Sequence, residues 1–113
     1  MRRNPSGLTG FLRAVLGFIG ESAVRSDLVQ SRQSGVSVRI RYKNNRGGGS
    51  ERNIDVLGTG NGYVDAFDHS SQEIRTFRIS RVKWTELTDA PFVISAEYVP
   101  SGWVRSGRGE IRR

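Results

Sequence analysis

The chain has 113 residues, the usual size of one domain and too short for two ordinary ones. It contains no cysteine and one histidine, which excludes disulfides, thiolate metal sites, cysteine nucleophiles and multi-histidine metal sites. Its formal net charge is +7, and the first 50 residues hold nine cations against two anions, so the whole excess lies there. Such a basic half attracts polyanions, although a solvated basic face would have the same composition. This composition favours a binding protein over an enzyme, and we expect no cofactor.

The amino-terminal region predicts one or two short helices. The apolar residues of 8–19 recur at i, i+3 and i+4, which is typical of a helix face. Within 8–19, the longest run without a charged residue is shorter than the ~7 residues of a signal-peptide core and the ~20 residues of a membrane span. We therefore expect a cytoplasmic protein without a membrane segment. Ser22 can cap a second helix from Ala23 to about Arg32, with Val24 and Leu28 on its inner face.

From Val36 the hydrophobic period changes to two. Residues Val36 to Lys43 alternate between apolar and polar, and the polar face carries Arg39, Arg41 and Lys43. Further strands are predicted at 52–57, 63–68, 73–79 and 81–87, with a glycine-rich loop at 44–50 and turns at 58–62 and 69–72; residues 92–99 fit a strand or a helix.

Short strands joined by glycine turns predict a mainly β protein, a small barrel or a strongly bent sheet, preceded by one or two short helices. We therefore divide the chain into a short helical extension at 1–35, a β-barrel at 36–99 and a basic flexible tail at 100–113.

Acidic residues surround the single histidine. Asp55, Asp65, Asp68, His69 and Glu73 could form a carboxylate–histidine metal or acid–base site. Polar residues are expected at the predicted turn in any case, and too few ligands are present, so we predict neither a metal site nor catalytic residues. The glycines of 58–62 match no phosphate-binding fingerprint.

Three arginines follow one predicted strand and its exit. Arg75, Arg78 and Arg81 lie beside an aromatic strand that contains Tyr63, a combination that suits a phosphate with a base, or a small anion. The alternative is that the aromatic side chains belong to the core and the arginines are solvated or paired with nearby carboxylates. We expect Phe67, Phe77 and Trp84 to belong to the core. For Tyr63 and the arginines both interpretations stay open.

Residues 36 to 92 resemble the WYL domain family. Gly62-Tyr63-Val64 stands at the namesake triplet, and Arg75-Thr76-Phe77-Arg78-Ile79-Ser80-Arg81-Val82 resembles the arginine strand. Weaker similarities are Ala66-Phe67-Asp68-His69, Ile40-Arg41-Tyr42, Arg52-Asn53-Ile54 and Leu87-Thr88-Asp89-Ala90-Pro91-Phe92. The resemblance implies an Sm-like, SH3-type β-barrel that senses a ligand and serves as a regulatory module, often fused to a winged helix-turn-helix.

The resemblance also implies the site residues. They are Tyr63, His69, Arg75, Arg78 and Arg81, with Arg52 second. Independently of the resemblance, the polar face of the strand at 36–43 gives a secondary basic patch of Arg39, Arg41 and Lys43. Two departures matter: Gly62 and Val64 replace the family's tryptophan and leucine, and residues 1–35 are too few for a winged helix-turn-helix. We therefore expect a stand-alone form.

The expected function is regulatory ligand binding. The module would recognise nucleic acid, in particular single strands, or nucleotide-like anions through a basic, aromatic pocket, in transcriptional or defence regulation. Its partners would be that anion and either a second copy or a partner regulator. The alternative is a structural, oligomerising protein that docks through the helix of 8–19.

Overall fold

The computed structural model describes residues 20–94, 98–99, 102–105 and 111–112. Its elements are α2 (Glu21–Ser34), β1 (Val36–Lys43), β2 (Gly49–Gly60), β3 (Tyr63–Asp68), β4 (Glu73–Arg78), the 3₁₀ turn η1 (Ile79–Arg81), β5 (Val82–Pro91), β6 (Val104–Arg105) and β7 (Ile111–Arg112). The helix expected at 8–19 lies outside the described residues. The described part of 92–99 forms no helix or strand.

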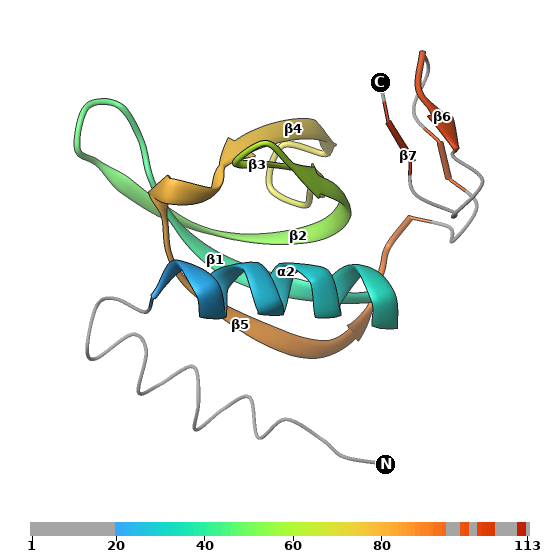
Figure 1. The fold of residues 1–113 in the computed structure, drawn as a ribbon, viewed down its shortest axis with the longest axis horizontal. Coiled ribbons are helices and arrows are strands. Elements are labelled where there is room, and N and C mark those ends of the chain that lie inside the picture. The colour runs from blue at the N-terminus through green and yellow to red at the C-terminus, as the bar shows by residue number, and fades with distance from the viewer. Residues whose placement is uncertain (1–19, 95–97, 100–101, 106–110, 113) are drawn as a thin grey trace.

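Five antiparallel strands form one bent sheet in the order β4-β3-β2-β1-β5 (Figure 1). This confirms the predicted mainly β class. The sheet is open rather than a closed barrel, because β4 and β5 stand at its two ends and do not pair with each other. The backbone donors at the end of β4 have other partners: the Arg78 N–H donates to the Tyr42 hydroxyl at 3.0 Å, and the Ile79 N–H donates to the Gly62 carbonyl at 2.9 Å.

Helix α2 covers one face of the sheet and packs against β2, β5 and β1 (Figure 1). Val24 and Leu28 are fully buried on the sheet, as their spacing predicts. The helix starts at Glu21, two residues earlier than predicted, with Gly20 as N-cap, so Ser22 lies within the first turn and the prediction that it caps the helix is wrong. Gly35 ends the helix in the left-handed conformation, at φ 67°, and its N–H donates to the Ser31 carbonyl.

The alternation of β1 gives the sheet its core face. Val38 and Ile40 are fully buried between α2 and the sheet, while Arg39 and Arg41 are exposed on the opposite face. Strand β2 is longer than the predicted 52–57, since it pairs with β1 from Gly49 onward and with β3 up to Gly60.

Both hairpin turns lie within their predicted ranges, but the first is shorter than the predicted 58–62, because Gly58 to Gly60 pair with β3 as part of β2. Asn61 and Gly62 connect β2 and β3 with φ of 54° and 81°, the left-handed pair of values that a two-residue hairpin needs. Residues 69–72 connect β3 and β4. The predicted strand at 73–79 ends at Arg78, where η1 begins, and Phe77 and Ile79 both enter the core.

Candidate anion-binding site

The register of β3 and β4 separates the predicted arginines onto two faces. Tyr63 pairs with Arg78, and Ala66 pairs with Arg75; directly paired residues share a face of the sheet. Ala66 is fully buried, so Arg75 lies on the face toward the core, whereas Tyr63 and Arg78 lie on the outer face and are exposed. The sequence prediction that Tyr63, Arg75 and Arg78 converge on one hollow therefore does not match this geometry.

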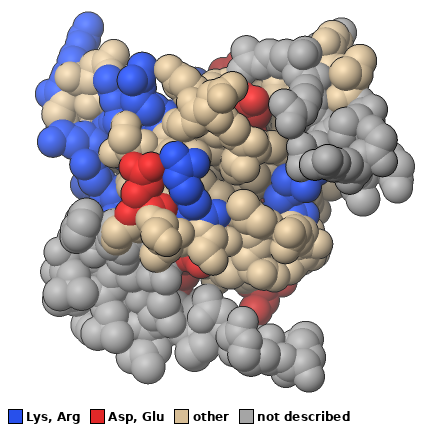
Figure 2. Space-filling model, in the orientation of Figure 1, with Lys and Arg blue, Asp and Glu red and all other residues tan. Residues whose placement is uncertain are grey.

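A cavity of about 240 Å³ opens at one end of the core, and we call it the basic hollow. It is lined by Tyr42, Asn44, Asn45, Ser50, Arg52, Arg75, Thr76, Phe77 and Arg81. Three of the predicted arginines thus come together here from β2, β4 and η1. Figure 2 shows lysine and arginine side chains gathered at the end of the molecule where Figure 1 places the β1–β2 loop.

An aromatic pair lies beside the three guanidinium groups. The rings of Tyr42 and Phe77 meet edge to face, with their centroids 5.0 Å apart. The Arg52 guanidinium carbon lies 5.9 Å from the centroid of the Phe77 ring. The hollow therefore combines an apolar wall with cationic groups.

The arginines differ in how far carboxylates neutralise them. Arg52 forms an ion pair with the fully buried Asp68. Arg75 Nε is 3.9 Å from the same carboxylate, and its Nη1 is 3.7 Å from the exposed Glu73. Arg81 has no carboxylate within ion-pair distance in the described part of the chain. The hollow keeps a positive charge.

Three uncharged side chains of the hollow use an acceptor oxygen for a hydrogen bond within the protein. The Tyr42 hydroxyl oxygen accepts the Arg78 N–H at 3.0 Å, and the Ser50 hydroxyl oxygen accepts Arg52 Nε–H at 3.1 Å. Asn44 Oδ1 accepts two backbone N–H groups of its own loop, at 2.9 and 3.0 Å. Their remaining hydrogens, with those of the guanidinium groups, are donors. The lining thus favours an acceptor-rich anion.

Sequence reasoning missed the contribution of β1 and its loop to this hollow. Tyr42, Asn44, Asn45 and Ser50 were not among the predicted site residues. A signal for Tyr42 exists in the sequence: it continues the inward alternation of Val38 and Ile40 by one step, to the end of the core.

Tyr63 and Arg78 line a second cavity of about 240 Å³ with residues of the α2 start and the β2–β3 turn. The Arg78 guanidinium carbon lies 5.4 Å from the Tyr63 ring centroid, a cation–π contact. Arg25, on α2, also lines this cavity and is paired with Glu21 at 2.9 Å.

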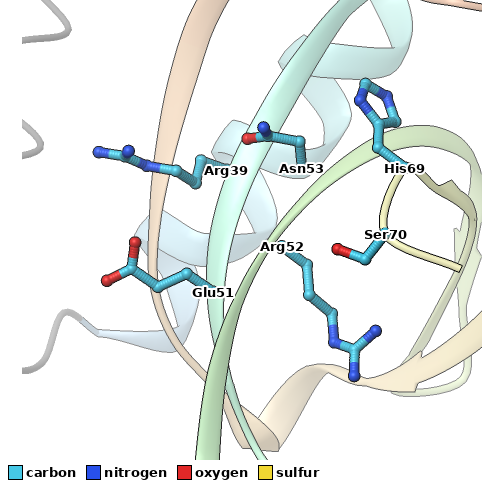
Figure 3. A pocket seen from close by; sticks show the side chains of 6 residues that line it. All are labelled: Arg39, Glu51, Arg52, Asn53, His69 and Ser70. Carbon is cyan, nitrogen blue, oxygen red and sulfur yellow. The ribbon is translucent and has the colours of Figure 1, made fainter.

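His69 lies on a third, wider hollow of about 360 Å³, shown in Figure 3. Arg39 and Arg52 point away from each other in this view, so the hollow does not gather their charges. In the secondary basic patch, Arg39 is paired with Glu86 at 2.6 Å and Arg41 with Glu51 at 3.9 Å, while Lys43 is exposed. Two of its three cations are therefore compensated.

The His69 imidazole is bound to a fully buried carboxylate. Its Nε2 lies 2.7 Å from Asp55 Oδ1, which also accepts the Ser37 hydroxyl at 2.6 Å. Asp55 Oδ2 accepts the backbone N–H of Val93 at 2.8 Å and that of Ile94 at 3.4 Å. Both oxygens are thus engaged in joining β1, β2, the β3–β4 turn and the segment after β5. No group of three or more metal-ligating side chains occurs within the described ranges.

The described residues contain no helix that is long and apolar enough to cross a membrane.

Comparison with known proteins gives a matching family model and similar solved structures. The family model described as "WYL domain" matches residues 23–87. The solved structure of proteasome accessory factor B/C (PafBC) of Arthrobacter aurescens is similar over 72% of this chain, with 26% sequence identity and a TM-score of 0.62. The match spans only 13% of the PafBC chain. No curated protein matches.

Proposed function

This chain belongs to the WYL domain family, in agreement with the resemblance of its arginine strand, and on that premise we propose that it is a regulatory module that senses nucleic acid or a nucleotide-like anion at the basic hollow. The family and the similarity to PafBC support a regulatory role, and we place this role in transcriptional control. The proposed ligand is single-stranded nucleic acid, because the hollow sets aromatic faces beside cations.

One observation carries the proposal: three guanidinium groups from separate elements meet in a hollow where Tyr42, Ser50 and Asn44 already use an acceptor oxygen within the protein. Phosphate oxygens only accept hydrogen bonds, and arginine matches them in a fixed fork. Arg81 contributes most on this view, because no carboxylate of the described residues competes for it. Tyr42 takes the place beside the arginines that the sequence suggested for Tyr63.

The test is a titration of a labelled short oligo(dT) over a salt series, followed by fluorescence anisotropy. Arg81→Gln and Arg75→Gln should each weaken binding by about 1–3 kcal/mol, the range of charge-assisted hydrogen bonds. Each should also reduce the slope of log K against log salt by about 0.7, the value for one lost contact to a single strand.

The matched control is Arg25→Gln, which removes one exposed arginine of α2 outside the basic hollow. It should change the affinity little. Absence of binding at low salt, or equal losses in Arg81→Gln and Arg25→Gln, would refute the proposed function.

A further inference from the structure

We propose that the basic hollow selects a terminal phosphate, that is a phosphomonoester, over the internal phosphodiesters of a strand. This rests on the proposed function, since it presupposes that a phosphate binds there. The chemical class is a phosphate with one ester bond, at the end of a strand or on a free mononucleotide.

The charge of the hollow is the first support. Arg52, Arg75 and Arg81 carry three positive charges, and the buried Asp68 carboxylate lies against two of them and offsets one. Glu73 is 62% exposed and 3.7 Å from Arg75, so solvent screens its contribution. The remaining excess of about two charges matches a phosphomonoester, which carries roughly −1.5 to −2 at pH 7, better than a phosphodiester with its single charge.

The placement of the donors is the second support. They belong to four elements around the hollow: Tyr42 ends β1, Ser50 and Arg52 lie on β2, Arg75 on β4 and Arg81 on η1. A phosphomonoester offers three terminal oxygens to such a ring of donors. An internal phosphodiester offers only two terminal oxygens, because its other two oxygens are bonded to the sugars on either side. One or more of these elements would then place its donors next to a sugar and not next to a terminal oxygen.

The size of the hollow is the third support. At about 240 Å³ it is smaller than the roughly 300–1,000 Å³ usual for small-molecule sites. It therefore suits one phosphate with its adjoining sugar, and the edge-to-face pair of Tyr42 and Phe77 offers that sugar an apolar wall. A terminal nucleotide meets both requirements, because the strand extends from it in one direction only.

The experiment compares strands that differ only at one end. Short oligo(dT) labelled at its 3′ end is titrated with a 5′-phosphate and with a 5′-hydroxyl, and the same strand labelled at its 5′ end is titrated with a 3′-phosphate and with a 3′-hydroxyl. At least one phosphorylated end should bind about tenfold more tightly than its hydroxyl counterpart. In Arg81→Gln this ratio should fall toward one, and Arg25→Gln should retain it.

Competition then identifies the source of the phosphomonoester. If thymidine monophosphate displaces the phosphorylated strand and thymidine does not, a free nucleotide suffices as ligand. If neither displaces it while the phosphorylated end is still preferred, the ligand is a strand end. Either result supports the selection of a phosphomonoester.

Equal affinities for phosphorylated and hydroxyl ends at both termini would overturn this inference. If Arg81→Gln still weakened all four strands in that case, the proposed function would stand and only the selection of the terminal phosphate would fall. Failure of every strand and of thymidine monophosphate to bind at low salt would remove both.

Discussion

Replacement of Asp55 should show how much the buried carboxylate contributes to stability. Asp55 is fully buried and accepts three hydrogen bonds of 2.8 Å or less, from the Ser37 hydroxyl, His69 Nε2 and the Val93 N–H. In Asp55→Ala all three donors lose their acceptor. Leaving the buried Ser37 hydroxyl without an acceptor costs about 1–3 kcal/mol of stability. The partly exposed His69 and Val93 can donate to water instead, so their loss of the carboxylate costs less.

The expected loss for Asp55→Ala is therefore about 2–4 kcal/mol, a large part of the roughly 5–15 kcal/mol of a typical domain. Asp55→Asn should lose only about 1 kcal/mol, because it keeps a carbonyl oxygen for the backbone N–H of Val93. Its amide NH₂ then faces Ser37 and His69, and both can accept: a hydroxyl by rotation and an imidazole in its other tautomer.

The assay is urea unfolding followed by the fluorescence of the buried Trp84. Glu73→Gln is the control, because this carboxylate is 62% exposed and should change the free energy of unfolding by less than about 0.5 kcal/mol. The hydrogen-bond reasoning fails if the free energy of unfolding of Asp55→Ala lies within about 1 kcal/mol of the wild-type value. It also fails if Asp55→Asn lowers that free energy as much as Asp55→Ala does.

Three further outcomes are expected. Leu28→Ala should lower the free energy of unfolding in urea by about 2–5 kcal/mol, because Leu28 is fully buried, whereas Val29→Ala on the exposed side of the same helix should be nearly neutral. Gly62→Ala should cost about 1 kcal/mol by the same assay through its φ of 81° alone, since its added carbon meets no neighbour; an equal loss in Gly60→Ala would contradict this. Tyr63→Ala should leave oligo(dT) affinity within about twofold of wild type, because Tyr63 lies in a separate cavity; an affinity loss like that of Arg81→Gln would place the ligand there instead.

Local chemistry explains the parts of the fold that could be predicted. The period of two in Val36–Lys43 gives the bounds of β1, and Asn61-Gly62 gives the hairpin turn, since both signals depend only on neighbouring residues. The Ser22 cap failed because a competing residue, Gly20, supplies the extended N-cap conformation two residues earlier without any side-chain bond. That the sheet stays open could not be predicted, because it depends on contacts of β4 with residues far away in the sequence, such as Tyr42.

The structure brings together only some of the predicted site residues, because Tyr63 and Arg78 share one face of the β3–β4 pair and Arg75 lies on the other. Arg75 and Arg78 differ by three positions, so they must lie on opposite faces of β4. With the turn at 69–72 the register pairs Tyr63 with Arg78, which removes both from the face of Arg75. The alternation of β1 places Tyr42 on the inner face, but no local pattern shows that this residue meets β4 across the bent sheet or that the loop residue Asn44 joins the same hollow.

The exposed edge at β4 has a consequence for solubility. In the described part of the chain β4 pairs with no strand other than β3, and of its backbone groups away from β3 the Arg78 N–H is bound to the Tyr42 hydroxyl. Edge strands are commonly protected against pairing with other molecules by charged side chains, and β4 carries Glu73, Arg75 and Arg78 within six residues. Apolar substitutions at these positions would therefore remove charges that protect against aggregation. Polar replacements such as glutamine keep this protection, so a weaker binding signal in such a variant reports lost affinity and not precipitated protein.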